Sequence, residues 1–415
     1  MLQFNVKRIM SLLLAAFLAL TVSPVVHASD VSAQNAQDTI CEYIEALDNN
    51  DWDKIITLSP DCDYQENVSF YYSEENAEND VGFHTITSAK LVTAIELDNK
   101  DLYDYTNAGY YFDTYNALKL YLVGVDMLAN KESKYFYNGV NFFLTTLGQE
   151  NGVWKVVLFS QAPATVIESA MAISAPISND GSYMNSADIE KALKIIRSRY
   201  EGLILGSEGS VIETNIASNA QLAEEKGLDV NNSYNLFDTP DTTASTDDHA
   251  RPSTIAVYMT STRKVKDVEF YDYCKGVLPN EWYSTWNEES LKAGAQAVKF
   301  VGWYRVYNAK YPGKGYDVKD SDADQVYKAG SEVSSCTSAI NAVGGIGMEN
   351  SDHEIFYPAY GRGVSGEAGE QYSGKLSQYG SQYLAKQESY TYDEILDYYY
   401  SFSGVSTDAI TTFSY

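Results

Sequence analysis

Residues 271–304 decide the fold of the second half of this chain, and they read YDYCKGVLPNEWYSTWNEESLKAGAQAVKFVGWY. Residues 271–277 are predicted to form a short helix or the end of a strand. The pair Pro279-Asn280 is a turn signal that ends this element. The segment after it is therefore expected to start a new element.

A helix is predicted to begin at Asn287, because Asn is a good N-cap and acidic residues in the first turn suit the helix dipole. Glu288 and Glu289 occupy that first turn. Small and apolar residues then recur at helical spacing and give the helix an apolar face. These residues are Leu291, Ala295, Val298, Val301 and Gly302.

Glu281 lies just before this helix, beside Trp282, Tyr283 and Trp286. A carboxylate among aromatic rings is a candidate for a raised pKa, because desolvation disfavours the charged form. A general acid needs such a pKa at neutral pH. The plainer alternative is that Glu281 is a solvated residue in a turn.

The order of residues around Glu281 resembles one known family. A Gly-Val pair, then Glu281, a Trp and the pattern E-x-LKA-x-A-x-A-x-[KR] are similar to the stage II sporulation protein D and amidase-enhancer family of cell-wall proteins. The resemblance implies that Glu281 is the catalytic acid, and Lys299 stands where the family usually has Arg. The matched residues are Gly276, Val277, Glu281, Trp286, Glu289, Leu291, Lys292, Ala293, Ala295, Ala297 and Lys299.

A second block of resemblance lies near the end of the chain. A Ser-Gln-Tyr-Gly turn and a Tyr-x-x-Ile-Leu-x-x-Tyr-Tyr helix match the family, so that the resemblance spans roughly residues 252–401. Between the two blocks, Tyr360, Ser365 and Gly366 keep only part of a Ser-rich stretch that usually ends in Gly-Gly. The matched residues of the second block are Ser377, Gln378, Tyr379, Gly380, Ala385, Gln387, Tyr392, Ile395, Leu396, Tyr399 and Tyr400.

The resemblance implies lytic transglycosylase action on peptidoglycan glycan strands, preferably those without peptide stems. Glu281 would protonate the glycosidic oxygen and then accept the proton of the muramic acid C6 hydroxyl as a 1,6-anhydro ring closes. Hydrolases of the two-carboxylate type need a second Asp or Glu, and the sequence shows none well placed. The alternative is a non-catalytic wall-binding protein that stimulates or recruits an amidase.

The predicted substrate-binding residues are of two kinds. Aromatic rings can stack on sugar faces, although Trp282 and Tyr283 replace the family's usual Met-Pro. Lys299 could hold the Glu281 carboxylate or contact substrate, with a solvent-facing charge as the alternative. The full set is Trp282, Tyr283, Trp286, Lys299, Gln325, Tyr327, Gln378 and Tyr379.

No metal and no cofactor are expected. Some family members carry a His-Cys zinc pair before a Gln-x-Tyr motif, but here Ala323-Asp324 precede Gln325. The four histidines, at positions 27, 84, 249 and 353, do not cluster. The alternating acids of 320–324 lack the Gly and distal Glu of an EF-hand loop.

The first 28 residues have the features of a signal peptide. Lys7 and Arg8 precede a short apolar run, and Val26-His27-Ala28 fits a cleavage site. We therefore expect a secreted, wall-associated protein. An uncleaved anchor is the alternative, although the apolar run is short for a spanning helix.

The segment 29–205 is predicted to be an α+β domain. A helical stretch over 38–58, broken at Asn49-Asn50, precedes strands at 68–72, 85–97, 134–147 and 153–160, with a hairpin turn at 150–152. This order weakly resembles the nuclear transport factor 2-like cone, with helices on a curved antiparallel sheet. The domain could dock a wall hydrolase or an envelope protein, or act as a spacer.

A helix over 186–204 ends this domain, and a polar linker follows over 206–251, with one short helix around 220–225. The family-like domain occupies 252–415 and opens with strands at 254–259 and 265–270. The whole chain is therefore predicted to be α+β.

The chain of 415 residues has a net charge of −28, which argues against nucleic acid as a partner. Residues 251–415 hold 15 basic and 21 acidic residues, so most of the excess acid lies before them. Four cysteines permit disulfides in an exported protein. Pairing Cys41 with Cys62 and Cys274 with Cys336 would keep each bridge inside one domain, and four buried free thiols are the alternative.

Overall fold

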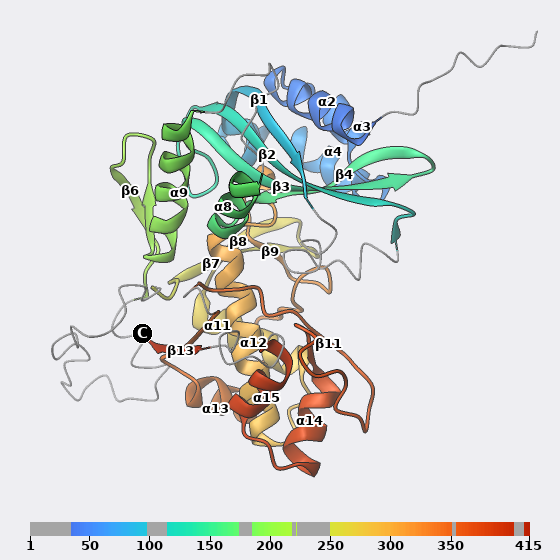
Figure 1. Cartoon of the computed structure of the whole chain (residues 1–415), viewed down its shortest axis with the longest axis vertical. Helices are drawn as coiled ribbons and strands as arrows, with labels where there is room; N and C mark the ends of the chain where they lie inside the picture. Colours follow the sequence, from blue (N-terminus) through green and yellow to red (C-terminus); the bar gives the residue numbers. More distant parts are fainter. Residues whose placement is uncertain are drawn as a thin grey trace, which may run out of the picture.

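The computed structural model describes residues 35–97, 114–173, 185–217, 221, 250–350, 354–401 and 411–415. The predicted signal peptide, most of the predicted linker and three of the four histidines fall outside them. Figure 1 shows one half built on an antiparallel sheet and the other half built around a long helix, α12. This mixture agrees with the predicted α+β class. The expected likeness to the nuclear transport factor 2-like cone is not confirmed.

The first half begins with α2 (Ala36–Asp48) and α3 (Trp52–Leu58), which agree with the helical stretch predicted over 38–58. The break also falls where it was expected, because Asn50 adopts a left-handed φ of 52°, which Asn tolerates better than most residues. Shorter helices follow: η1 (Asp61–Asp63), α4 (Tyr64–Tyr71), α5 (Glu74–Glu78) and η2 (Gly82–Thr85).

The strand predicted at 68–72 is wrong, because these residues lie mostly in α4. Its buried residues, Asn67 and Tyr71, are four positions apart. That spacing is one helical turn. The aromatic composition of this segment favoured a strand, but only one side of it meets the core.

A four-stranded antiparallel sheet forms the centre of this half. In chain order it runs β1 (Ile86–Glu96), β2 (Leu118–Ala129), β3 (Gly139–Glu150) and β4 (Val153–Gln161). The strands predicted at 85–97 and 153–160 are confirmed, and the one at 134–147 begins later, at Gly139. The hairpin turn is also confirmed, since Asn151 and Gly152 both have positive φ, as a type I′ turn requires.

Strand β2 was missed because it is covered on both faces. Six consecutive residues from Leu120 to Val125 are buried, so the strand lacks the alternation of a half-exposed one. Val123 and Val125 contact a core that includes α2 and α3. Leu120 and Leu122 contact the opposite core, together with α8 (Ala164–Ile173) and α9 (Ser186–Tyr200).

The helix predicted over 186–204 ends at Tyr200. A small hairpin follows, β5 (Leu203–Leu205) with β6 (Val211–Thr214). The first part of the predicted linker is thus a hairpin. Asn215 after it accepts hydrogen bonds from the backbone of Ser253 and Thr254. Of the short helix predicted around 220–225, only Gln221 is described.

The second half opens with β7 (Thr254–Met259) and β8 (Lys264–Glu269), close to the two predicted strands, and β9 (Val318–Lys319) pairs with β7 in parallel. The helices are α11 (Phe270–Glu281), α12 (Glu288–Tyr307), η3 (Pro312–Lys314), α13 (Ser334–Ala342), α14 (Gln378–Gln387) and α15 (Tyr392–Tyr400). Two short pairs complete it, β10 (Ile346–Glu349) with β13 (Thr411–Ser414), and β11 (Tyr360–Gly361) with β12 (Leu376–Ser377).

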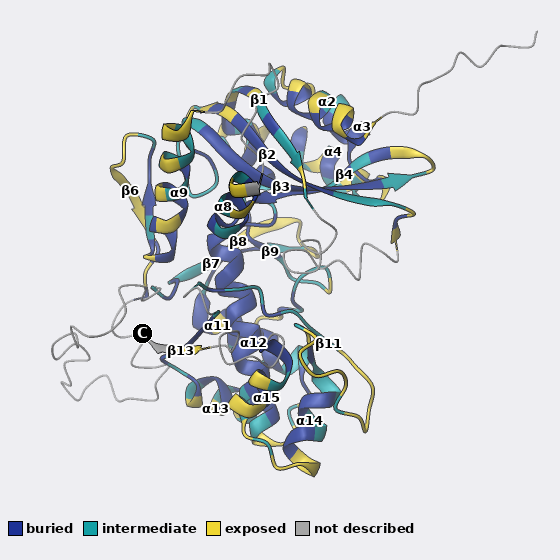
Figure 2. Ribbon diagram, viewed as in Figure 1, coloured by how far each residue is buried: buried dark blue, intermediate teal, exposed yellow. Residues whose placement is uncertain are grey.

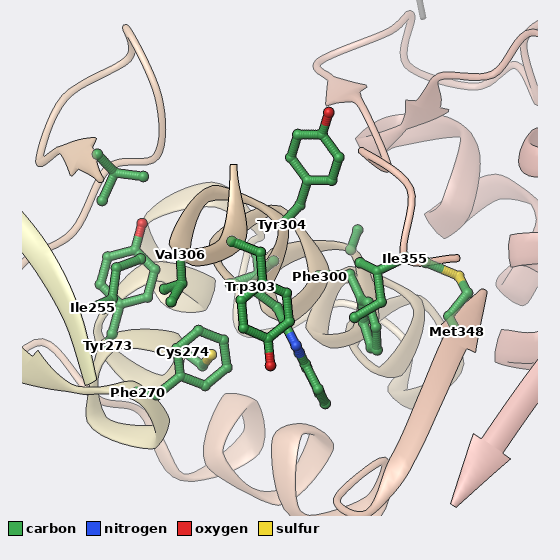
Figure 3. Close-up of a cluster of buried hydrophobic side chains, with 14 of the residues drawn as sticks. Ile255, Phe270, Tyr273, Cys274, Phe300, Trp303, Tyr304, Val306, Met348 and Ile355 are labelled. Atoms are coloured by element: carbon green, nitrogen blue, oxygen red, sulfur yellow. The ribbon is translucent and has the colours of Figure 1, made fainter. Parts of the chain in front are cut away.

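Helix α12 begins where it was predicted, with the Asn287 side chain accepting from the backbone N–H of Glu289 at 2.9 Å. Its burial exceeds the single apolar face that was predicted. From Ser290 onward nearly every residue is buried, because α11, α13, α14 and α15 all pack around it. Figure 3 shows its Phe300, Trp303 and Val306 among side chains of β7 and α11.

The two halves share one apolar core, which runs from β2 and β3 to α11 and α12. Polar contacts join them as well. Glu66 of α4 accepts from Lys314 Nζ at 2.6 Å, Lys319 Nζ at 2.9 Å and the Tyr316 hydroxyl at 3.0 Å. Lys134 pairs with the fully buried Asp317 at 2.7 Å. Figure 2 shows buried residues continuing across this junction.

All four cysteines lie in the described part of the chain and are thiols, so neither of the disulfides considered above is formed. Cys41 and Cys62 are exposed, whereas Cys274 and Cys336 are buried. Among the described residues, no helix has both the length and the apolar character needed to cross a bilayer.

Candidate active site

Glu281 is the last residue of α11, and Pro279 lies in the last turn of that helix. The prediction that Pro279-Asn280 ends the element before Glu281 is therefore wrong. A proline this close to a helix end disturbs only one turn. In the same turn the Gly276 carbonyl accepts from Asn280 Nδ2 at 2.8 Å, from the Lys328 backbone N–H at 3.1 Å and from Ser331 Oγ at 3.3 Å.

Three separate segments hold the Glu281 side chain. The backbone N–H of Val326 donates to Oε1 at 2.8 Å. Gln378 Nε2 donates to Oε2 at 3.2 Å and to the Glu281 carbonyl at 2.9 Å. Tyr360 is near the carboxyl group and favours its charged form. The carboxyl is thus fixed in one position between α11, the loop before α13 and the start of α14.

Burial raises the pKa of Glu281 above its ordinary value, and it outweighs the hydrogen bonds from Val326 and Gln378, which favour the charged form. The negative charge of Asp322 acts in the same direction as burial. The C-terminal end of α11 adds a partial negative charge beside the carboxyl. This direction agrees with the expected general acid.

A buried polar network lies behind this carboxyl. Tyr273 donates to Gln325 Oε1 at 3.0 Å, and Gln325 Nε2 contacts the Tyr360 hydroxyl at 3.1 Å and the Val298 carbonyl at 3.2 Å. Gln325 is fully buried. The prediction that Gln325 binds substrate is therefore wrong, and its role here is to fix Tyr360.

Tyr327 is also buried, and its ring stacks on Tyr273 with 5.3 Å between centroids. A Cβ on Gly276 would lie 2.6 Å from the Tyr327 ring. The glycine of the Gly-Val pair thus lets the loop of Val326 approach α11. The prediction that Tyr327 contacts substrate is wrong, because the ring faces the protein interior.

Three aromatic rings form a surface cluster beside Glu281, which we call the aromatic platform: Tyr283, Trp286 and Tyr379. Their centroids are 5.1 Å apart for Tyr283 and Trp286, 5.2 Å for Trp286 and Tyr379, and 6.3 Å for Tyr283 and Tyr379. Tyr283 is 60% exposed. These predicted residues meet at one place, next to the carboxyl.

Trp282 points the other way. It is buried, its Nε1 contacts Ser381 Oγ at 3.3 Å, and its ring meets that of Tyr360 edge to face. Trp282 directly follows Glu281, but its ring faces the protein interior. The prediction that Trp282 stacks on substrate is therefore wrong. Trp282 instead supports the wall behind Glu281.

Lys299 is buried in the middle of α12. Its Nζ donates to the carbonyls of Val343 and Ile346 at 2.9 and 3.0 Å and to the Tyr415 hydroxyl at 3.0 Å. Those carbonyls follow the end of α13, where a cation is favoured. The predictions that Lys299 steadies Glu281 or contacts substrate are therefore wrong, as is the solvent-facing alternative.

The position of the family's His-Cys pair is occupied by an ion pair. Lys310 Nζ bonds Asp324 at 2.6 Å and the Ala323 carbonyl at 2.8 Å, and both charged side chains are buried. No group of three or more His, Cys, Asp or Glu side chains suited to a metal occurs among the described residues. The expected absence of zinc stays a prediction.

The acidic residues at the start of α12 have structural partners. Lys292 pairs with Glu288 and Glu289 at 2.7 and 2.9 Å, and Glu289 Oε2 accepts from the N–H of Tyr392 at the start of α15. These contacts agree with the predicted place of both residues in the first turn of the helix.

Part of the C-terminal half matches a known protein family. Residues 258–348 match the SpoIID family model, described as Stage II sporulation protein. This match supports SpoIID family membership for the C-terminal half. It suggests a role related to the cell wall. No match was found among the curated proteins.

The matched SpoIID segment runs from β7 to β10 and contains Glu281, Trp286 and Val326. Gln378 and Tyr379 lie beyond it, yet their side chains complete the site. Sequence reasoning missed the Val326 N–H, Tyr360 and Asp322. Val326 lies inside the Gln-x-Tyr motif, and Tyr360 lies in the partly kept Ser-rich stretch, so both had a weak signal.

Proposed function

We propose that this protein is a lytic transglycosylase that cleaves peptidoglycan glycan strands, preferably peptide-free ones, with Glu281 as general acid and then base. The observation that carries the proposal is a fixed carboxyl of raised pKa near the aromatic platform, of which the Tyr283 ring is exposed and the other two rings are half-buried. The carboxyl supplies a proton and the platform supplies a surface for sugar rings.

In the first step, protonated Glu281 gives its proton to the glycosidic oxygen, and the bond from that oxygen to C1 of the muramic acid breaks. In the second step, the C6 hydroxyl of the same sugar forms a bond to C1. Its proton passes to the Glu281 carboxylate, which restores the acid. No water is consumed, so one carboxyl group is sufficient.

The hydrogen bonds to Glu281 suit both steps. The donors from Val326 and Gln378 stabilise the carboxylate after the first proton leaves. Burial and Asp322 favour the acid before that transfer. The two sets of contacts act in opposite directions on the pKa of Glu281, and burial is the larger effect.

We further propose that the protein is secreted and associated with the cell wall, as residues 1–28 suggest. In this proposal the N-terminal half holds the catalytic half by their shared core. In this proposal the N-terminal half also provides the surface that binds another wall hydrolase or an envelope protein. Glycan strands are the proposed ligand of the C-terminal half.

The test uses the whole chain, because the core is continuous between the halves. Peptide-free glycan strands are incubated with the wild-type protein, Glu281→Gln and the control Glu288→Gln, whose carboxylate is mostly exposed. Mass spectrometry then reads the ends of the products. We expect 1,6-anhydro ends from the wild type and the control only.

Reducing ends would make the protein a hydrolase and would direct attention to Asp322 as a second carboxylate. Binding without cleavage by any form would favour the non-catalytic wall-binding alternative. Equal cleavage by Glu281→Gln would remove Glu281 from the mechanism.

A further inference from the structure

The aromatic platform has a cation at its edge, inside the partly kept Ser-rich stretch that contains Tyr360. Arg362 follows β11, and its guanidinium lies over the Tyr379 ring at 5.9 Å from the centroid. The Tyr379 ring in turn lies 6.3 Å from that of Tyr283, centroid to centroid. Arg362 therefore belongs to the same surface as two of the three platform rings.

The backbone of Arg362 is held in place although the loop after it is long and exposed (Figure 2, beside the β11 label). β11 pairs with β12 immediately before it, and the Arg362 carbonyl accepts from the N–H of Tyr379 at 3.1 Å. The next residue, Gly363, has a φ of 67°, and a Cβ there would lie 1.8 Å from Ser377 Oγ. Arg362 thus sits at the closed base of the loop.

The position of Arg362 relative to Glu281 follows from the start of α14. Gln378 Nε2 donates to the Glu281 carboxyl at 3.2 Å. The next residue is Tyr379, whose ring lies under the Arg362 guanidinium. Two consecutive residues of α14 therefore connect the proposed catalytic acid with the cation.

Arg362 is a positive charge without an ion-pair partner among the described residues, in a protein that is acidic overall. The net charge is −28, but no carboxylate of the described residues forms an ion pair with Arg362. Lys375 lies nearby against Gly361, and the loop also carries Glu367 and Glu370, both exposed. An anionic ligand that approaches an acidic protein is repelled unless a local cation receives it.

We propose that Arg362 binds the lactyl carboxylate of muramic acid and thereby selects glycan strands without peptide stems. This rests on the proposed function, because it names the feature of the strand that the same site recognises. Muramic acid carries a lactyl ether whose carboxyl is an amide when a peptide stem is attached and a free anion when it is not. Guanidinium matches a free carboxylate with two parallel hydrogen bonds, whereas an amide offers no charge.

The proposal assigns different tasks to the parts of the site. The platform contacts sugar faces whatever their substituents, and the raised-pKa acid acts on the glycosidic bond. Arg362 alone distinguishes a free carboxylate from its amide. Loss of Arg362 should therefore remove selectivity while neutral sugar chains bind as before.

The experiment measures binding rather than cleavage, in full-length protein with Glu281→Gln so that the strands stay intact. The probes are peptide-free glycan strands, the same strands with their carboxyls converted to methylamides, and a neutral N-acetylglucosamine oligomer. Each probe is titrated against this Glu281→Gln parent and against four double variants, which add R362Q, R362K, K375Q or K386Q to it. Lys386 is an exposed residue of α14 and provides the matched loss of one charge.

We expect the parent to bind free-carboxyl strands about three- to tenfold more tightly than methylamide strands, the range of one exposed charge-assisted contact. R362Q should bring this ratio to about one without changing binding of the neutral oligomer. K375Q and K386Q should keep the ratio, and R362K should keep part of it. The ratio should fall as salt is added.

The proposal would be overturned if the parent bound free-carboxyl and methylamide strands equally well. It would also be overturned if R362Q left the affinity ratio of the two strands unchanged, whether or not K375Q removed it. The two proposals fail separately. Selective binding without cleavage by the wild type would refute the transglycosylase and keep the Arg362 assignment. Cleavage without selectivity would do the reverse.

Discussion

At the scale of single residues, the site depends on opposing effects on one carboxyl group. Burial and Asp322 raise the pKa of Glu281, and the donors from Val326 and Gln378 lower it. Burial is the larger effect, so the net direction is upward. Two substitutions can move the balance in opposite directions, which makes the assignment of Glu281 open to test.

Asp322→Asn removes a negative charge near Glu281, so the pKa of Glu281 should fall toward its ordinary value. In the proposed mechanism cleavage needs protonated Glu281, so activity should be lost as pH rises through that pKa. The high-pH limb of kcat/KM should therefore move to lower pH, by about half a unit or less for an exposed charge. The profile is measured at low salt, with Asp272→Asn as the control. A limb that stays in place would contradict the coupling.

Gln378→Leu removes the donor to Glu281 Oε2 and to the Glu281 carbonyl. The charged form loses a partner, so the pKa should rise and the high-pH limb should move to higher pH. The looser carboxyl should also lower kcat about tenfold. Gln382→Leu, one turn later on α14, is the matched control, since Gln382 accepts from the Asn287 N–H. Equal effects of both substitutions would point to helix packing instead.

At the scale of elements, α12 carries the architecture because other elements surround it. Glycines let aromatic rings approach it closely. A Cβ on Gly294 would lie 2.6 Å from the Trp282 ring, which sits beside Glu281. The position of the acid therefore depends on a contact between the end of α11 and the middle of α12.

Gly294→Ala should displace Trp282 and lower stability by about 1–3 kcal/mol, the usual cost of overpacking. It should also lower the rate of cleavage, because Trp282 follows Glu281 directly. Thermal unfolding and strand cleavage measure the two effects. Adding Trp282→Met provides a narrower side chain and should recover part of both. If the double variant is no better than Gly294→Ala, the clash is not the cause.

The buried ion pair between Lys310 and Asp324 also connects elements of the fold. It joins the loop after α12 to the segment that leads to Val326. The same position holds zinc ligands in some proteins of the family that the sequence resembles. A buried pair costs desolvation, but here each charge also bonds backbone groups. The segment of Val326 is thereby tied to the body of the domain.

At the scale of the whole molecule, Glu66 links the halves. Burial alone would raise the pKa of Glu66, but Lys314 and Lys319 overcome this and lower it to about 2. The two lysines differ: burial lowers the pKa of Lys314, whereas in Lys319 the attraction of Glu66 outweighs burial and raises it. The carboxylate is nevertheless charged at neutral pH, and it holds both ammonium groups.

Glu66→Gln should destabilise the protein by about 3 kcal/mol at pH 7, because two buried ammonium groups lose their counter-ion. The folded pKa of Glu66 is depressed, so its stabilisation is present above the unfolded value of 4.5 and is lost as pH falls to about 2. The difference from the wild type in denaturant unfolding should shrink over that range. Glu42→Gln, from an exposed pair with Lys54, should change stability by less than about 1 kcal/mol. A pH-independent difference would exclude the ion cluster as its source.

Local patterns determined much of this protein. The N-cap at Asn287, the break at Asn49-Asn50 and the turn at 151–152 depend on one or two residues each, so the sequence predicted them. The motif around Glu281 identified the candidate acid and, with Tyr283, Trp286 and Tyr379, its aromatic neighbours. These features need no knowledge of distant contacts.

The tertiary structure decided what those residues face. Trp282, Lys299, Gln325 and Tyr327 carry groups suited to sugars, but elements far away in the chain bury them and satisfy their polar atoms. Strand β2 and helix α12 lack the burial pattern of elements with one exposed face, because other elements cover them on more than one side. The hydrogen bond from Gln378 to Glu281 joins residues 97 positions apart, and Arg362 meets the Tyr379 ring across a loop. Burial and long-range contact are properties of the packed chain, and local sequence does not encode them.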